Sequence, residues 1–155
     1  MDMSYPIFIC SKDRVNGSSA SYTVNVNADR ILKDDADFFE VCLVRFFACS
    51  NNGTNLNQIS ALTNLTNFYQ IQLSLAQPFN IYTGTSVLKN SSFLVPTVSC
   101  NNVPALIYSG KQEIVVSKAS LANLLQVTIF DDTGSVITPV ASGEHVMQLS
   151  FKPLR

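Results

Sequence analysis

The C-terminal part of the chain, residues 124–151, alternates regularly between apolar and polar positions. Apolar side chains stand at every second residue in two runs: Leu125, Val127 and Ile129, and then Met147, Leu149 and Phe151. A period of two residues is that of a strand with one buried face. Between these runs, Asp131, Asp132 and Gly134 predict a short hairpin loop in which Gly134 takes a positive φ. We therefore expect three consecutive strands, 124–130, 136–138 and 146–151, with an apolar face that a second layer must cover.

Similar patterns predict strands earlier in the chain. Residues 5–10, 22–26 and 69–75 have strand character, and the last two alternate clearly. Asn16-Gly17 is a strong signal for a chain reversal between the first two of these strands. Weaker runs indicate further strands at 80–82, 93–98, 105–108 and 113–116, and leucine and isoleucine at three-residue spacing within 51–67 predict short helical turns.

The segment 38–49 differs from the others because apolar side chains occupy both parities. This pattern is typical of a central strand covered on both faces. In a two-layer sandwich one face would belong to the core, and the other would meet a loop or another subunit. We take one parity as the candidate subunit interface: Phe39, Val41, Leu43, Arg45 and Phe47.

Eight to ten short strands without a βαβ pattern predict an all-β fold. We expect one domain spanning residues 1–155, an antiparallel two-sheet sandwich with short helical turns in its connections. A jelly roll and an immunoglobulin-like sandwich both fit this count. The absence of tryptophan and of a Cys…Trp…Cys arrangement favours a single jelly roll of about eight strands.

The composition suggests a partly covered surface. Charged residues make up 14% of the 155 residues, against about a quarter in typical soluble proteins. A surface so poor in charge indicates burial against partners, although a neutral exterior of hydroxyl and amide groups would give the same count. The net charge of −1 has no basic stripe, so nucleic-acid binding is not expected. No secretory signal or membrane-spanning run is recognisable, and we expect synthesis in the cytoplasm without membrane insertion.

The residues that could perform chemistry do not form a known catalytic or metal-binding pattern. Four cysteines lack C-x-x-C spacing, and we interpret them as buried free thiols. His145 is the only histidine, and its parity in the last strand predicts a hydrogen-bonded histidine at a strand end. The adjacent Asp131 and Asp132 are typical turn formers. We therefore expect no catalytic residues, no metal and no cofactor, and hence no enzyme.

Two stretches carry a resemblance to a known family. The opening segment Ser11–Ser19 (SKDRVNGSS) with the strand 22–26, and the closing segment 125–134 (LQVTIFDDTG), resemble the single jelly-roll penton and minor capsid proteins of double-stranded DNA viruses of eukaryotes. That group includes large icosahedral algal and amoebal viruses, virophages and polinton-like elements. The resemblance covers about a third of the chain.

The resemblance implies a structural role in a virion. The expected partners are copies of the same chain in a homopentamer at a fivefold vertex, and neighbouring major and minor capsid proteins. A minor protein that braces the inner face of the shell is the other position that the resemblance allows. A ring of subunits joins two different surfaces of each copy, so two distinct interaction surfaces are expected.

Two other classes of function remain open from the residues alone. A carbohydrate-binding or adhesive sandwich would need an exposed aromatic platform, for which Tyr69, Tyr82 and Tyr108 are the candidates. An enzyme of the cupin type would need several metal-binding histidines, and the chain has one.

Overall fold

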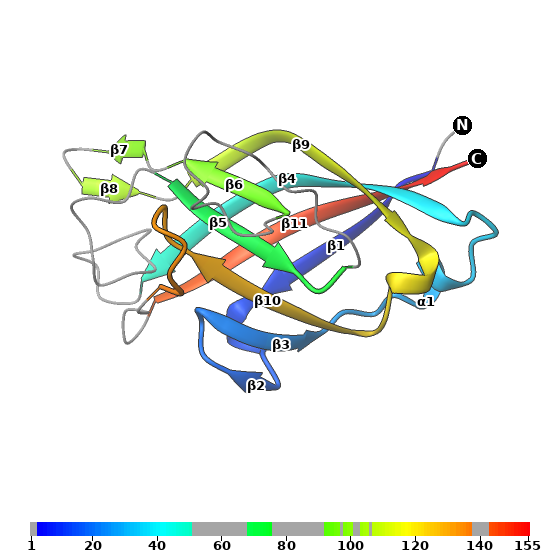
Figure 1. Cartoon of the computed structure of the whole chain (residues 1–155), viewed down its shortest axis with the longest axis horizontal. Coiled ribbons are helices and arrows are strands. Elements are labelled where there is room, and N and C mark those ends of the chain that lie inside the picture. The colour runs from blue at the N-terminus through cyan, green and yellow to red at the C-terminus, as the bar shows by residue number, and fades with distance from the viewer. Residues whose placement is uncertain are drawn as a thin grey trace.

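A computed structural model describes residues 3–50, 68–75, 92–96, 98–100, 103–105, 107–137 and 143–155. These residues form two antiparallel sheets packed face to face, with both ends of the chain at the same end of the sandwich (Figure 1). The predicted all-β sandwich is confirmed. The expected helical turns within 51–67 and the strand at 80–82 lie outside the described residues.

The two layers draw strands from the whole chain. The first sheet has the order β1 (Tyr5–Cys10), β11 (Gly143–Leu154), β4 (Phe38–Ser50) and β9 (Ile107–Ser117). The second has the order β2 (Asn16–Gly17), β3 (Ser21–Asn25), β10 (Leu124–Phe130), β5 (Phe68–Leu73) and β6 (Phe93–Pro96). A separate two-stranded sheet consists of β7 (Val98–Cys100) and β8 (Val103–Ala105).

The strand pairs are nested within one another. β1 pairs with β11, β3 with β10, β4 with β9, and β5 with β6. The chain therefore resembles one long hairpin that is wrapped up so that successive strand pairs belong alternately to the first and the second sheet. This is the jelly-roll arrangement. This order confirms the jelly-roll prediction and gives places to the strands between residues 68 and 117, whose order the sequence left open.

Short helical segments connect the strands, as expected. Within the described residues these are the 3₁₀ turns η1 (Ser11–Asp13) and η2 (Lys118–Ser120) and the α-helical turn α1 (Asp29–Leu32). The Ile31 side chain of α1 is buried against one end of the sandwich core. These turns carry the chain across the ends of the sandwich from one sheet to the other.

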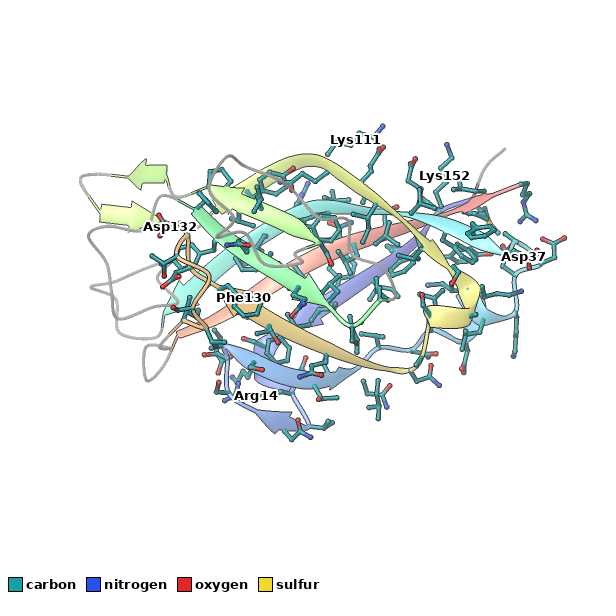
Figure 2. The ribbon with its side chains drawn as sticks, viewed as in Figure 1. Arg14, Asp37, Lys111, Phe130, Asp132 and Lys152 are labelled. Carbon is teal, nitrogen blue, oxygen red and sulfur yellow. The ribbon has the colours of Figure 1, made fainter. Side chains whose placement is uncertain are left out.

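The core lies between the sheets and follows the predicted alternation. Side chains from both layers fill the space between the ribbons (Figure 2). The first sheet contributes Ile9, Phe39, Val41, Leu43, Phe46, Met147 and Leu149, and the second Tyr22, Val24, Ile71, Leu73, Val127 and Ile129. Burial of this apolar surface from two layers is the main stabilising contribution to such a fold.

One edge of the sandwich is closed by a side-chain amide. Gln112 of β9 accepts a hydrogen bond from the Leu94 amide of β6, at 2.8 Å, and donates one from its Nε2 to the Leu94 carbonyl. Because β9 and β6 are edge strands of different sheets, this pair of bonds joins the layers where no backbone ladder can.

The central strand β4 contains a bulge that the sequence did not reveal. Its register against both β11 and β9 shifts between Leu43 and Arg45, so Val44 has no partner. An extra residue reverses the parity beyond it, and Phe46, rather than Phe47, therefore points into the core. The expectation that Phe47 shares a face with Phe39 and Leu43 is wrong for this reason.

The two strands predicted on either side of Gly110 are a single strand in the structure, opposite the bulge. The sequence suggested two short strands separated by a loop, but β9 runs without interruption through Gly110. Leu43 pairs with Gln112 and Arg45 with Ser109, so Gly110 and its neighbour lie opposite the bulge of β4. A residue without a side chain is suited to such an irregular pairing.

The predicted three-strand meander at the C-terminus is wrong. Val136 returns alongside Phe130 only as an isolated bridge, and β11 crosses to the other sheet. There it lies between β1 and β4. The apolar alternation of 146–151 was identified correctly, but alternation does not specify which layer a strand joins.

The Asn16-Gly17 reversal is displaced by a few residues. These two residues form β2 and pair with Thr23 and Tyr22. The chain turns immediately after them, where the Ser18 amide donates to the Ser21 carbonyl at 2.9 Å. Gly17 has φ +92° and lies immediately before the turn, not at its centre.

Candidate functional site

The candidate interface residues divide between the core and the surface. Phe39, Val41 and Leu43 are completely buried between the sheets. A side chain in the core of its own chain cannot contact a second molecule, so the assignment of these three to an interface is corrected. Arg45 is exposed and Phe47 is 42% exposed, both beyond the bulge on the outer side of β4. These two remain candidates for an interface.

The strand register surrounds Phe47 with other apolar positions. Cys10 pairs with Val146, and Val146 pairs with Phe47. In the next row Phe8 pairs with Gln148, which pairs with Arg45. Phe8 is 67% exposed. We call these outward residues, Phe8, Cys10, Arg45, Phe47, Val146 and Gln148, the aromatic patch; it covers β1, β11 and β4 at one end of the first sheet.

The other end of the same outer face is also partly apolar. Phe38 pairs with Leu154, and both side chains are exposed. Between the two apolar ends lie charged residues, including Glu40, which pairs with Lys152. Lys111 and Lys152 point away from the sandwich (Figure 2). The outer side of this sheet therefore combines apolar and charged zones.

The outer side of the second sheet has a different chemistry. Its side chains are mainly hydroxyls and amides: Ser21 and Thr23 on β3, Gln126 and Thr128 on β10, and Gln72 on β5. Ser21 and Thr128 lie within hydrogen-bonding distance of each other, with 3.3 Å between their oxygens. The large apolar exceptions on β10 are Leu124, at 57% exposure, and the half-buried Phe130 at the other end of the strand. The two outer faces are thus chemically distinct.

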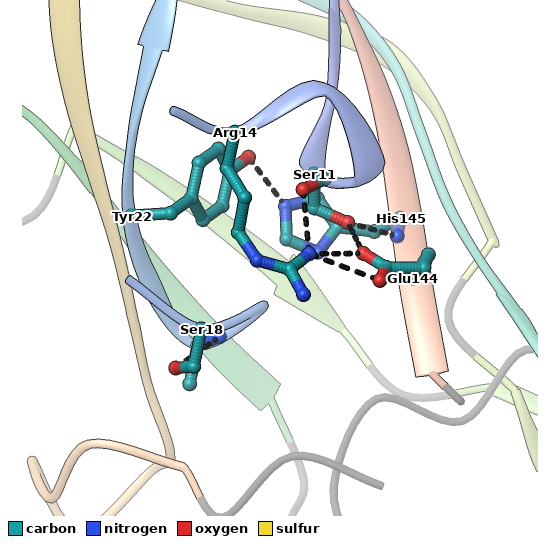
Figure 3. A network of polar contacts seen from close by, with 7 residues as sticks. Ser11, Arg14, Ser18, Tyr22, Glu144 and His145 are labelled. Atoms are coloured by element: carbon teal, nitrogen blue, oxygen red, sulfur yellow. Dashed lines mark hydrogen bonds and ion pairs between the residues drawn. The ribbon is translucent and has the colours of Figure 1, made fainter. Parts of the chain in front are cut away.

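A buried polar cluster lies where η1 and β3 meet β11. His145 is fully buried, and its Nε2 lies 2.7 Å from the Tyr22 hydroxyl (Figure 3). The imidazole is stacked on Phe46, with 5.2 Å between ring centroids. Its Nδ1 is buried and has no hydrogen-bond partner in the part of the chain that the structure describes. The prediction of a hydrogen-bonded histidine at the strand end is confirmed for one of its two ring nitrogens.

A second set of contacts holds η1 against the start of β11. Ser11 Oγ accepts a hydrogen bond from the His145 amide at 2.9 Å and donates one to Glu144. Arg14 forms an ion pair with Glu144 at 3.0 Å and donates to the Ser11 carbonyl at 2.8 Å (Figure 3). The Glu144 carboxylate, which lies next to the buried imidazole, thus has its hydrogen-bonding partners in Ser11 and Arg14.

Burial controls the protonation of both rings in this cluster. Desolvation and, to a smaller extent, the nearby Arg14 cation together lower the pKa of His145 to about 3. Desolvation also raises the pKa of Tyr22 well above its usual range. The imidazole and the phenol are therefore both neutral at physiological pH, and neither forms an ion pair with the other.

The cluster was not predicted as a unit. The alternation placed Tyr22 and His145 on inward faces, but nothing in the sequence joined them to Ser11, Arg14 or Glu144. Ser11 and Glu144 are 133 residues apart in sequence. A histidine at an inward position of a strand rich in apolar residues was the one available signal.

The turn residues of the 131–135 loop have the roles that the sequence indicated. Gly134 has φ +82°. The Asp131 carboxylate accepts hydrogen bonds from the amides of Thr133 and Ser135, at 2.9 and 3.0 Å. Asp132 is half-buried in the same turn. This arrangement is that of a side chain stabilising its own loop.

The structure tests only some of the predictions about the tyrosines, the cysteines and metal binding. Tyr69 is buried and Tyr108 packs partly against the core, so these two do not form an exposed aromatic platform; Tyr82 lies outside the described residues. Cys10 and Cys42 are free thiols, but half-buried rather than buried. Within the described ranges no cluster of three or more potential metal ligands occurs. No helix there is both long and apolar enough to cross a bilayer.

Comparison with known proteins gives no assignment. No protein-family model matches the chain, and no curated protein matches its sequence.

Proposed function

We propose that this protein is a structural virion protein, a single jelly-roll capsid component located in the capsid. A penton protein at the fivefold vertex is the position we favour, and a minor capsid protein that braces the shell is the second. The nested strand order supports this proposal, because viral capsid proteins are one of the groups built on the jelly roll. Lectin and cupin domains share that architecture, so the fold alone does not decide.

The observation that carries the proposal is the aromatic patch. Phe8 and Phe47 expose large apolar side chains on the outer side of a regular sheet, and the exposed Arg45 stands two residues before Phe47 on the same side of β4. Aromatic residues and arginine are the types enriched in protein interfaces, whereas a monomer gains nothing from exposing them together. The low proportion of charged residues, 14%, is in agreement.

The difference between the two outer faces supports a ring. In a closed ring each subunit presents one surface to one neighbour and a different surface to the other. The aromatic patch and the hydroxyl- and amide-rich face of the second sheet are two such surfaces. The proposed partners are other copies of this chain and the neighbouring capsid proteins.

The oligomeric state of the purified protein tests the proposal. Native mass spectrometry and light scattering should find a pentamer, and particle images should have fivefold symmetry. Phe47→Ser and Arg45→Glu should each weaken assembly by about tenfold or more, because loss of a hot-spot residue at the centre of an interface costs about 2 kcal/mol or more.

The matched control is Phe38→Ser, the same kind of substitution at an exposed phenylalanine that lies at the other end of the first sheet, outside both proposed surfaces. Assembly should be unchanged in this variant if the aromatic patch is the contact. A monomer that neither assembles alone nor enters capsid shells would refute the proposal. A monomer that gives a clear hit on a glycan array would support the carbohydrate-binding alternative instead.

A further inference from the structure

His145 is enclosed by four separate elements of the fold. Tyr22 of β3 and Phe46 of β4 both lie against the imidazole, with their ring centroids 5.4 and 5.2 Å from its own. Ser11 of η1 lies against its backbone amide, and its own strand β11 supplies Glu144. The ring has no exposed surface. Water can therefore reach it only if one of these elements moves.

The groups around the ring cannot stabilise an imidazolium. Arg14 is a cation, and the carboxylate of Glu144 is already bonded to Arg14 and Ser11. Tyr22 is neutral, and Cys10, at the end of β1, is a free thiol. A proton on Nδ1 would have no acceptor among the described residues. The sequence contains no Asp or Glu in residues 51–67, 76–91 or 138–142 either.

The part of the structure that holds the ring closed is the N-terminal corner, residues 11–22, which comprises η1, β2 and the start of β3. Polar contacts between Ser11 and Arg14 on one side and Glu144 and the His145 amide on the other tie this corner to β11. The Tyr22 hydroxyl provides the further link to the imidazole. These contacts are side-chain bonds rather than a backbone ladder between the corner and β11.

We propose that His145 makes the N-terminal corner an acid-sensitive latch, which opens in mildly acidic solution as the ring takes up a proton from water. In the closed state the neutral imidazole is bonded to Tyr22. In the open state that bond is broken, and the imidazolium is hydrated. This inference rests on the geometry of the cluster and holds whether or not the chain belongs to a capsid.

The direction of the pH dependence follows from linkage. The closed state binds the proton with a pKa near 3, whereas a hydrated histidine has a pKa of about 6.5. The contribution of the neutral ring is complete above pH 6.5 and is lost as the pH falls toward 3. Between pH 7 and pH 5 the opening equilibrium should rise about twentyfold, while ordinary carboxylates stay ionised.

The first test needs no substitution, because the chain has one histidine. Its imidazole proton resonances can be followed by NMR from pH 7.5 to 5. The latch predicts a closed-state signal that does not titrate and a second signal, from protonated histidine, that grows as the pH falls. A folded-state signal titrating with a midpoint near 6.5 would overturn the proposal.

The second test locates the opening by hydrogen exchange, corrected for the intrinsic pH dependence of exchange. Peptides covering residues 11–25 and 143–148 should lose protection about twentyfold between pH 7 and pH 5, while peptides from β9 keep theirs. His145→Gln, which stays neutral, should abolish the pH dependence. Tyr22→Phe, which removes the hydroxyl but keeps the histidine, should retain it.

Two outcomes of the exchange experiment would contradict the latch. One is an equal loss of protection in β9, which would mean that acid unfolds the whole sandwich rather than the corner. The other is an unchanged pH dependence in His145→Gln, which would assign the effect to another group.

Discussion

Several single residues in this structure have roles that depend on one bond or one torsion angle. Gly17 occupies a positive φ immediately before the turn of the β2–β3 hairpin. The Asp131 carboxylate organises a loop through bonds to Thr133 and Ser135. His145 is fully buried although its Nδ1 has no hydrogen-bond partner among the described residues. At this scale, local geometry and solvation decide which substitutions the fold tolerates.

Gly17→Ala should destabilise the protein by about 2 kcal/mol or more, since a left-handed backbone is unfavourable for alanine and no space exists for its methyl group. An added Cβ would lie 2.2 Å from the Ser21 carbonyl oxygen. Urea unfolding measures the change. Gly110→Ala is the comparison, because the added Cβ would meet only the movable end of the Tyr108 side chain. An equal or larger loss in Gly110→Ala would contradict this account.

At the scale of elements, the sandwich is closed by contacts between edges as well as between faces. β9 and β6 are edge strands of different sheets, and Gln112 joins them by bonding both the amide and the carbonyl of Leu94. The bulge in β4 acts at the same scale, because one unpaired residue turns Phe47 outward and Phe46 inward. The aromatic patch exists as a consequence of that bulge.

Gln112→Met should lower the free energy of unfolding by about 1–3 kcal/mol, because it leaves the polar backbone groups of Leu94 without their partner while keeping the volume of the side chain. Thermal and denaturant unfolding measure the loss. Gln126→Met, at an exposed position of β10, should change stability by less than about 0.5 kcal/mol. Equal effects of the two substitutions would show that the edge contact does not stabilise the fold.

On the scale of the whole molecule, nesting makes every layer depend on both ends of the chain. β11 lies between β1 and β4, and β10 lies between β3 and β5. Neither half of the sequence can therefore complete a sheet alone. The same arrangement places the N-terminal corner against the start of β11, so that a local opening there can expose this part of β11 while the ladder between β1 and β11 stays intact.

We expect the isolated chain at neutral pH to unfold in one cooperative transition. Far-UV circular dichroism and tyrosine fluorescence should give coincident denaturation curves, because the sheets share strands from the entire sequence. Folding should be slow, in the range of milliseconds to seconds that is typical of domains dominated by non-local pairing. Two separated transitions would indicate that part of the described sandwich is stable without the remainder.

Much of the fold could be predicted from residue patterns. Tyr22, Val24, Ile71, Val127 and Leu149 all point inward as their alternation required. The count of short strands and the absence of a βαβ pattern favoured a sandwich, and the nested order bears out a jelly roll. The turn role of Gly134 could be assigned because only glycine adopts its φ without strain.

The candidate surface was predicted less well. Of the five proposed interface residues, Phe39, Val41 and Leu43 are in the core. The error came from assuming that every second residue of β4 faces the same side along the whole strand. No property of Val44 indicates that the strand bulges there. Phe8 was overlooked because it belongs to a different strand, and only the register of β1 with β11 brings it near Phe47.

The sequence by itself determined where most of the strands run and, outside the bulged part of β4, which of their side chains face inward, because alternation is a property of neighbouring residues. The tertiary structure alone decided which sheet each strand joins, where the parity of β4 reverses, and that Tyr22, Ser11 and Glu144 surround His145. Those outcomes depend on pairing between distant segments, and the contacts of the His145 cluster join residues more than a hundred positions apart. Such pairing is selected by how well whole layers pack, which no local pattern records.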